Sequence, residues 1–232
     1  MRLGSPASSA RARCRVLVDF DGTVAPDDPT DRILERFAAP AWRDIEEGWQ
    51  AGRMSSRECM RRQVALLRAT PEELDDEIGN VRVDPGFHPF VRFCILQGMV
   101  VTVVSDGFDR LVRAVLQGER LALPFFANRL EWQGRDRWHL EFPHARRDCQ
   151  VGAGNCKCSH GARPRNGPCV VIGDGRSDFC MSVHADFVIA KGSLVDFCRR
   201  RGLSYASFAN FDHATQHLSR WLARSFADAA PR

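Results

Sequence analysis

The chain has 232 residues, of which 44% are hydrophobic, so it can bury one α/β core with a modest insertion. Its net charge is +4, and aromatic residues do not alternate with a basic stripe, which argues against a nucleic-acid partner. The longest apolar runs are far shorter than a bilayer span and no signal-peptide core follows the start, so we expect no membrane partner.

Residues 1–13 are small, polar and basic. They could resemble part of a transit peptide, but such a composition favours a disordered tail, which is our prediction. The chain also contains nine cysteines, an odd number, scattered through apolar segments and loops alike. Because this pattern is more typical of reduced thiols than of a disulfide framework, we expect a cytoplasmic protein.

The first predicted strand ends in two carboxylates. Residues 16–18 form an apolar run with β-branched side chains, and Asp19, Asp21 and Gly22 follow. Such a run fits a strand buried on both faces, and the glycine gives the backbone the freedom to turn out of it. Ligands bind at the carboxyl ends of strands in open α/β sheets, so the position favours a function. An Asp-Gly turn without function is the alternative, and three segments downstream argue against it.

Residues 29–84 carry the sequence signals of helix ends. Segments 55–58 and 70–73 both match capping boxes, Pro71 occupies a first helical position and Gly79 can end the second helix. We interpret this stretch as a helical insertion that projects from the strand ends as a cap and excludes water. Charged residues on such helices are mostly solvated. The candidates for ligand recognition there are Asp27, Asp28, Arg57 and Arg61.

A second apolar run, residues 100–104, is followed by Ser105 and Gly107. A hydroxyl and free backbone N–H groups at this point could hold a phosphate oxygen. Beyond it, residues 108–117 follow a helical pattern that Gly118 can stop. Residues 127–142 alternate apolar and polar side chains on both sides of a turn, which predicts a β-hairpin.

Lys157 is unusual because 31 of the 33 basic residues are arginine and the only other lysine is Lys191. A compact ammonium serves sites that a planar guanidinium does not fit. Two glycines precede Lys157 and open the backbone, which favours a role in a site. For Lys191 we expect a solvated side chain near a strand end.

Three cysteines and a histidine lie close to Lys157 in the sequence, namely Cys149, Cys156, Cys158 and His160. They could be imagined as zinc ligands, but the Cys-x-Cys spacing is tighter than the usual knuckle and no matching second pair exists. We therefore expect Cys156 and Cys158 to pack around Lys157.

A third apolar run, residues 169–173, places Asp174 and Asp178 beyond its end. With Asp19 and Asp21, four carboxylates then lie at strand ends. Unpaired carboxylates at one edge repel each other unless a divalent cation sits among them, and clustered oxygen ligands suit magnesium. The sequence therefore predicts Mg²⁺ as the cofactor.

The C-terminal part continues the alternation of strand and helix. Residues 187–190 predict a strand, and residues 194–201 predict a helix that Gly202 stops. A last amphipathic helix carries an apolar stripe of Leu218, Trp221, Leu222 and Phe226. Packing of this stripe on the domain is the favoured interpretation and a dimer face is the alternative, so we expect a monomer or a homodimer.

In order and spacing, four of these segments resemble the motifs of the haloacid dehalogenase superfamily. The segments are residues 19–23, Ser105, Lys157 and residues 173–178, and the match covers nearly the whole chain. Within the superfamily the chain resembles the phosphoserine-phosphatase-like branch and most closely the MtnX-like phosphatases, which are similar to 2-hydroxy-3-keto-5-methylthiopentenyl-1-phosphate phosphatase. The residues that carry this second resemblance are Trp49, Gly52, residues 56–59, Gln63 and residues 154–157.

The resemblance implies an α/β fold with a Rossmann-like parallel-sheet core and a small helical cap inserted after the first strand. The core would comprise residues 14–28 and 85–232, and the cap residues 29–84. Asp19 would be the nucleophile that forms an aspartyl phosphate, and Asp21 would act as general acid and then as general base.

The same resemblance implies how the metal and the phosphate are held. Magnesium would be bound by Asp19, the backbone carbonyl of Asp21, and Asp174, with Asp178 as a further ligand or an outer partner. The phosphate oxygens would be held by Thr23, Ser105, Gly107 and Lys157.

These features imply a magnesium-dependent phosphomonoesterase of a small phosphorylated metabolite, with 2-hydroxy-3-keto-5-methylthiopentenyl-1-phosphate as one candidate substrate. A rival is phosphoserine phosphatase, where a cap acid and a cap arginine read the amino-acid head group. Asp28 and Arg61 occupy those positions here, but Asp28 is shorter than the expected glutamate. A rival of another class is a catalytically silent module that binds phosphorylated ligands, and the presence of both Asp19 and Asp21 argues against it.

Overall fold

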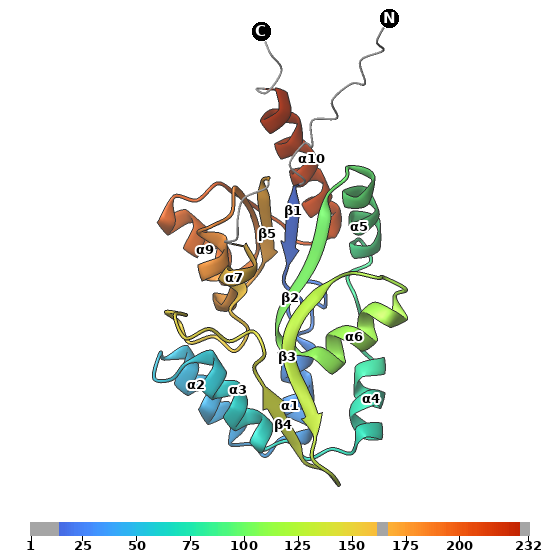
Figure 1. Cartoon of the computed structure of the whole chain (residues 1–232), viewed down its shortest axis with the longest axis vertical. Coiled ribbons are helices and arrows are strands. Elements are labelled where there is room, and N and C mark those ends of the chain that lie inside the picture. Colours follow the sequence, from blue (N-terminus) through green and yellow to red (C-terminus); the bar gives the residue numbers. More distant parts are fainter. Residues whose placement is uncertain (1–13, 162–166, 228–232) are drawn as a thin grey trace, which may run out of the picture.

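One seven-stranded sheet forms the centre of the computed structural model, which describes residues 14–161 and 167–227 (Figure 1). The strand order is β4-β3-β2-β1-β5-β6-β7, and β4 alone runs antiparallel to its neighbour. The strands are β1 Arg15–Val18, β2 Val100–Phe108, β3 Phe125–Trp132, β4 Trp138–Glu141, β5 Cys169–Gly173, β6 Phe187–Ala190 and β7 Tyr205–Ser207. The predicted α/β class with a Rossmann-like parallel sheet is confirmed.

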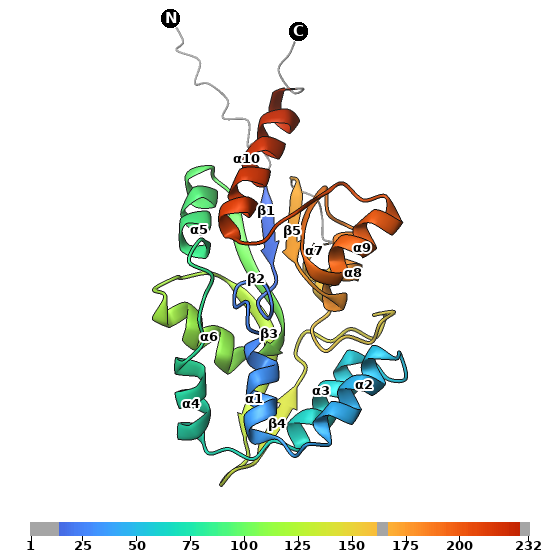
Figure 2. The same ribbon diagram turned by 180° about the vertical axis from the view of Figure 1, so that it is seen from behind.

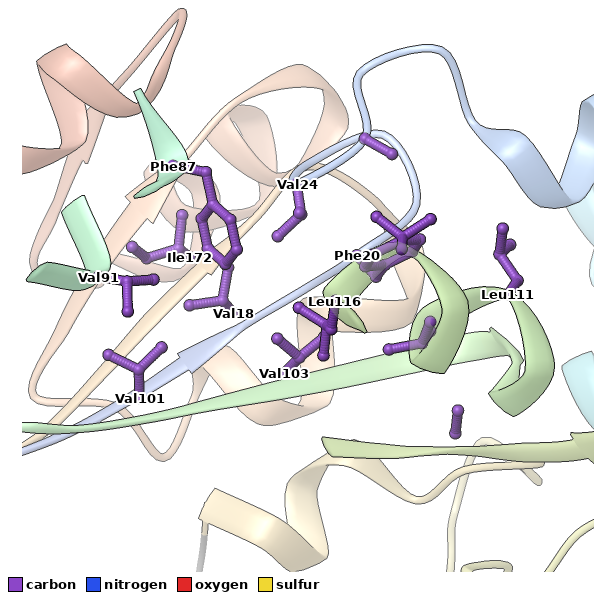
Figure 3. Packing of buried hydrophobic residues seen from close by; sticks show 14 of the residues in the cluster. Val18, Phe20, Val24, Phe87, Val91, Val101, Val103, Leu111, Leu116 and Ile172 are labelled. Carbon is purple, nitrogen blue, oxygen red and sulfur yellow. The ribbon is translucent and has the colours of Figure 1, made fainter. Parts of the chain in front are cut away.

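The central strand β1 is buried on both faces, as its sequence predicted. Val16 and Val18 belong to one apolar cluster, and Leu17 belongs to a second cluster on the opposite face of the sheet. Alternate side chains of a strand point to opposite faces, so a continuous apolar run is needed where both faces are covered. Figure 3 shows the first cluster, in which Phe87 packs near Val18 and Ile172.

Helices cover both faces of the sheet (Figures 1 and 2). The first face carries α5 Phe87–Leu96, α6 Asp109–Gly118 and α10 Phe211–Ala227. The second face carries α7 Lys157–Gly161, α8 Phe179–Ser182, which follows a 3₁₀ turn at Arg176–Asp178, and α9 Gly192–Arg201. The helices predicted at 108–117 and 194–201 are confirmed to within two residues, including the stop at Gly202.

The last helix packs on the domain. Leu218 of α10 is fully buried, and the ring of Trp221 stacks on Phe187 of β6 at a centroid distance of 5.6 Å. The packing interpretation of the apolar stripe is thus supported for Leu218, Trp221 and Leu222. The side chain of Phe226 and the tail predicted at residues 1–13 lie outside the described residues. A homodimer stays a prediction.

Four helices lie beyond the carboxyl ends of β1 and β2, in the lower part of Figures 1 and 2. They are α1 Pro29–Phe37, α2 Trp42–Gln50, α3 Ser56–Ala65 and α4 Pro71–Gly79. Thr70 and Glu73 form the predicted capping box at the start of α4. Ser55 caps α3 through the Glu58 N–H, but the Glu58 side chain turns away to Arg61 and Arg62.

The predicted hairpin exists as β3 and β4, and it packs on the cap helices. The Trp138 indole N–H donates to the Ala69 carbonyl at 2.8 Å, and the Ala69 N–H donates to the Asp136 carbonyl at 3.2 Å. β4 also lies against α3. The division into a core and a cap at residues 29–84 remains our proposal, and these contacts show where the core hairpin meets that stretch.

Short or irregular elements escaped the sequence analysis. β7 has three residues, Tyr205–Ser207, which is too short for a period to be recognised.

Within residues 14–161 and 167–227, no helix combines the length and the apolar character needed to cross a membrane.

Candidate active site

The loop after β1 directs two carboxylates away from the core. Asp19 extends the strand, because its N–H donates to the Ile172 carbonyl of β5 at 2.9 Å. Phe20 is fully buried in the apolar cluster shown in Figure 3, so its neighbours Asp19 and Asp21 face the other way. Gly22 has a φ of +73°, and a Cβ there would lie 2.5 Å from Asp174 Oδ2. Only glycine fits this turn, as the sequence suggested.

Two hydroxyl groups and one backbone N–H hold the Asp21 carboxylate. Thr30, in the first turn of α1, donates to Asp21 Oδ1 from its N–H at 3.2 Å and from its hydroxyl at 2.7 Å. The Ser105 hydroxyl donates to Asp21 Oδ2 at 2.8 Å, and the Gly107 N–H donates to the Ser105 oxygen at 2.8 Å. A Cβ on Gly107 would lie 2.7 Å from Asp21 Oδ2. Two strand ends and a cap helix therefore orient one carboxylate.

Lys157 is almost completely buried at the start of α7. Its ammonium group forms ion pairs with Asp19 Oδ1 and, at 2.8 Å, with Asp178 Oδ1, and it donates to the Ser177 hydroxyl at 3.0 Å. Burial alone would lower the pKa of Lys157, but the carboxylates of Asp178 and Asp19 outweigh it and raise the pKa above its ordinary value. Lys157 is therefore a permanent cation at the strand ends.

Three carboxylates meet beside this cation. Oxygen atoms of Asp19, Asp174 and Asp178 all lie within 4.8 Å of one another. Burial, followed by the charge of Asp178, raises the pKa of both Asp19 and Asp174, while Lys157 opposes the shift. Such a set of oxygen ligands fits a hard divalent cation, whose charge would relieve the repulsion.

A cavity of about 180 Å³ lies over these groups. Asp19, Asp21, Gly107 and Asp174 line it from the core. Trp49 of α2 and Met60 and Gln63 of α3 line it from the other side. The helices after β1 therefore cover the carboxylates, as expected of a cap.

Comparison with known proteins agrees with this geometry. A family model for haloacid dehalogenase-like hydrolases matches residues 16–182. The chain belongs to this family. It is 34% identical over 211 residues to 2-hydroxy-3-keto-5-methylthiopentenyl-1-phosphate phosphatases of Geobacillus kaustophilus (strain HTA426) and Geobacillus thermodenitrificans (strain NG80-2), an alignment that covers 87% of this chain and 94% of each relative. The predicted resemblance to the superfamily and to its MtnX-like members is confirmed.

Solved structures show the same fold. A phospho-aspartyl intermediate analogue of phosphoserine phosphatase superposes with a TM-score of 0.69 at 21% identity, covering 89% of this chain and 98% of that one. A substrate-bound phosphoserine phosphatase superposes with a TM-score of 0.60 at 24% identity, covering 80% and 90% of the two chains. The haloacid dehalogenase-like fold is thus shared with the phosphoserine phosphatases.

Several residues predicted for the site of this haloacid dehalogenase-like hydrolase lie elsewhere. The buried Thr23 hydroxyl donates to Asp174 Oδ1 at 3.3 Å and does not line the cavity. Asp27 is exposed, and Arg57 does not line the cavity. The Arg61 guanidinium pairs with Glu58 at 2.6 Å and lies over the ring of Phe142.

Asp28 does line the cavity. It caps α1 by accepting the Asp31 N–H at 3.1 Å, with a backbone φ of +44°. Burial, followed by the charge of Asp21, raises the pKa of Asp28 to about 8. Burial and the Glu46 carboxylate likewise raise the pKa of Asp31 to about 6. The cap side of the cavity is therefore acidic.

Asp106 is a site residue that the sequence analysis missed. Its Oδ1 accepts the Asn155 N–H at 3.0 Å, and its Oδ2 accepts the Ser56 hydroxyl of α3 at 3.2 Å. Burial raises the pKa of Asp106, and the charge of Lys157 opposes the rise. This carboxyl joins the cap to the loop that carries Lys157. Its position at the end of β2 was the available signal, by the same rule that identified Asp19.

The zinc hypothesis finds no support. Among the described residues, the only group of three or more possible ligands with metal spacing is that of Asp19, Asp174 and Asp178. His160 is instead 2.8 Å from the Asn155 side-chain oxygen. Cys156 and Cys158 flank Lys157 in the sequence, and their sulfur atoms are 3.3 Å apart.

Lys191 differs from its prediction. Its side chain is half-buried, and its ammonium lies 5.4 Å from the centre of the Phe208 ring. The expected solvated lysine is thus a cation–π partner.

Replacing Asp28 should change the pH dependence of stability. Below the ordinary pKa of 3.8 Asp28 is protonated in both states; as pH rises to about 8 the unfolded state ionises first, so the folded protein loses stability. Asp28→Asn removes this loss. In excess chelator, its Tm should equal wild type near pH 4 and exceed it by roughly 3 °C or more at pH 8.

Differential scanning calorimetry of the metal-free proteins measures this, with the exposed neighbour Asp27→Asn as the matched control. A Tm difference for Asp28→Asn that is independent of pH would contradict the burial of this carboxyl.

Proposed function

We propose that this protein is a magnesium-dependent phosphomonoesterase that hydrolyses a small phosphorylated metabolite through an aspartyl phosphate. The observation that carries the proposal is the buried Lys157 ammonium between Asp19 and Asp178, behind a cavity that Asp19, Asp21 and Asp174 line. Phosphoryl transfer depends mainly on positioning and on electrostatic stabilisation. These groups supply both.

Asp19 is the proposed nucleophile. One of its oxygens is held by Lys157, and its backbone is fixed in register with β5 by the hydrogen bond to Ile172. The carboxylate, which lines the cavity, is therefore held in a fixed position. Attack on phosphorus gives an acyl phosphate on Asp19 and releases the alcohol, and water then hydrolyses the acyl phosphate.

Asp21 is the proposed proton donor and acceptor. Thr30 and Ser105 orient its carboxyl group, which lines the same cavity as Asp19. It would protonate the leaving alkoxide in the first step and deprotonate the attacking water in the second. We assign the phosphate oxygens to the Ser105 hydroxyl, the Gly107 N–H and the Lys157 ammonium, which would have to exchange their present contacts with Asp21, Ser105 and the Asp19 and Asp178 carboxylates. The Thr23 hydroxyl supports Asp174.

The oxygen donors support a magnesium site. We assign its ligands to Asp19, the Asp21 carbonyl and Asp174. Bound there, magnesium would neutralise charge on the transferring phosphoryl group. Both oxygens of Asp178 are engaged already, Oδ1 with Lys157 at 2.8 Å and Oδ2 with the N–H groups of Asp174 at 3.2 Å and Gly175 at 3.3 Å. We therefore assign Asp178 to the outer partners.

The cap side of the cavity favours the substrate of the MtnX-like relatives. Trp49, Cys59 and Met60 offer it apolar and sulfur surface, which suits a methylthio group. A phosphoserine carboxylate would need a cation, but Arg61 pairs with Glu58, and Arg176, which lines the cavity, donates to the Gln50 carbonyl. We therefore place 2-hydroxy-3-keto-5-methylthiopentenyl-1-phosphate before phosphoserine, and a catalytically silent binding module last.

Since none of the nine cysteines forms a disulfide, we assign the enzyme to a reducing compartment, the cytoplasm.

The metal requirement gives the direct test. Purified protein should hydrolyse a generic aryl phosphate with Mg²⁺ and lose that activity on chelation, because the carboxylates need a counter-charge. Activity should return when Mg²⁺ is added in excess. Steady-state rates across a metal titration measure this, and full activity in excess chelator would sink the assignment.

Substitution separates the two carboxylates of the first loop. Asp19→Asn should abolish turnover and phosphoenzyme alike, because the amide is not a nucleophile. Asp21→Asn should slow turnover by roughly a hundred- to ten-thousand-fold, the usual range for lost acid–base catalysis. Rapid-quench trapping with a ³²P-labelled substrate distinguishes them. A phosphoenzyme trapped on Asp19→Asn would show that the nucleophile is another residue.

Lysine-to-arginine exchange tests Lys157 as a point charge. In Lys157→Arg, the larger planar guanidinium group should displace Asp19 or the phosphate, and a misplacement of about an ångström can reduce the rate a hundred-fold. Lys191→Arg is the matched control, since arginine can also lie over the Phe208 ring. Rates are compared after circular dichroism has shown both variants folded. Equal, near-wild-type rates would remove Lys157 from the site.

A further inference from the structure

Four cysteines that the proposed mechanism does not use lie together on the second face of the sheet. Cys149, Cys156, Cys158 and Cys180 all line a cavity of about 1280 Å³, which borders the catalytic cavity at Ser177. α7 and α8, which carry Cys158 and Cys180, lie side by side (Figure 2). Thiols that line an open cavity are accessible to small oxidants.

Cys156 and Cys158 are in direct contact. Their sulfur atoms are 3.3 Å apart, with Lys157 as the single residue between them. The Cys156 side chain is almost fully buried, Cys158 is half-buried, and both line the cavity. Disulfide formation brings two sulfurs to about 2.05 Å, so this pair needs an approach of roughly 1.2 Å. The remaining distance is small enough for a local backbone movement to close.

We propose that Cys156 and Cys158 form a peroxide-reactive dithiol, and that their disulfide displaces Lys157 from the catalytic carboxylates. The second part rests on the proposed function. Lys157 is the middle residue of the ring that the disulfide closes, and its ammonium contacts Asp19 and Asp178. A closed ring of three residues cannot keep the helical start of α7 unchanged, so the lysine moves.

The chemistry balances with hydrogen peroxide as the oxidant. One thiol of the pair attacks a peroxide oxygen as its thiolate, the O–O bond breaks, and a sulfenic acid and one water form. The other thiol then attacks the sulfenic sulfur, the S–O bond breaks, and the disulfide and a second water form. The two thiols together lose two protons and two electrons, which reduce the peroxide. A dithiol reductant reverses the step.

The position of Lys157 allows a direct map of the bond, because trypsin cleaves after lysine between the two cysteines. Reduced protein is treated with equimolar hydrogen peroxide and digested without reductant. We expect an intact-mass loss of two hydrogens and a bond between the fragment of residues 148–157 and the fragment that begins at Cys158. Tandem mass spectrometry of the joined fragments should place the bond on Cys156 and leave Cys149, in the same fragment, as a free thiol, and a bond on Cys149 would overturn the pairing. Aryl phosphate hydrolysis should fall about a hundred-fold, as for a misplaced catalytic group, and recover with dithiothreitol.

Serine variants provide the controls. On peroxide treatment, Cys158→Ser should show no mass loss of two hydrogens and should keep its activity. Cys180→Ser retains both Cys156 and Cys158 and should behave as wild type. Fragments joined through Cys158 and Cys180, or a Cys180→Ser protein that forms no disulfide, would overturn the pairing. A mapped Cys156–Cys158 bond with an unchanged rate would overturn the effect on Lys157.

Two further results are distinguishable. If Cys158→Ser fails to fold, the fragment map of the wild-type protein and its reversal by dithiothreitol decide the pairing alone. If the reduced protein hydrolyses no aryl phosphate at all, the proposed function fails, and the fragment map still supports or overturns the dithiol.

Discussion

The buried ammonium group of Lys157 is the charge on which the arrangement of the strand ends depends. It contacts Asp19 after β1 and Asp178 after β5, two neighbouring parallel strands in which Val18 lies opposite Ile172. Removing one partner of a buried ion pair typically costs about 3–5 kcal/mol, because the other charge is left unpaired in a medium of low polarity. A single cation therefore fixes two carboxylates from separate strands, and this proximity is what makes a third carboxylate, Asp174, part of one group.

The backbone around these charges is packed as tightly as the side chains. At Gly22 a Cβ would meet Asp174, and at Gly107 it would meet the Thr30 hydroxyl at 2.5 Å. Both glycines let a loop approach a carboxylate more closely than any other residue allows. The loop after β1 is also fixed by the buried side chain of Phe20 and by the Asp84 N–H, which donates to the Val24 carbonyl at 2.9 Å. The carboxylates are thus oriented by a rigid frame, which phosphoryl transfer requires.

What the sequence predicted depended on how far apart the interacting residues are. Strand ends bearing Asp19, Ser105 and Asp174 were predictable, because parallel strands bring their carboxyl ends to one edge. The capping box at Thr70 was predictable, because its partners are three residues apart. The bridge from Asp106 to Ser56 of α3 was not, since it depends on how the cap docks. Arg61 and Glu58 are three residues apart, so their pairing has helical spacing. Which charged residues of the cap face the cavity, however, depends on how the cap docks on the core.

The distribution of arginine limits how a phosphate can be held. Although 31 residues are arginine, Arg176 is the only one among the described residues to line the catalytic cavity, and it donates to the carbonyl of Gln50 at 2.8 Å. Asp28, next to the cap, and Asp31 and Glu46 of the cap also line the cavity, and they repel an anion when ionised. The positive charge that stabilises the transferring phosphoryl group must then come from Lys157 and from a metal among the carboxylates. Such a division keeps the cations on the rigid core, and it leaves the cap to select the leaving group by shape and hydrogen bonding.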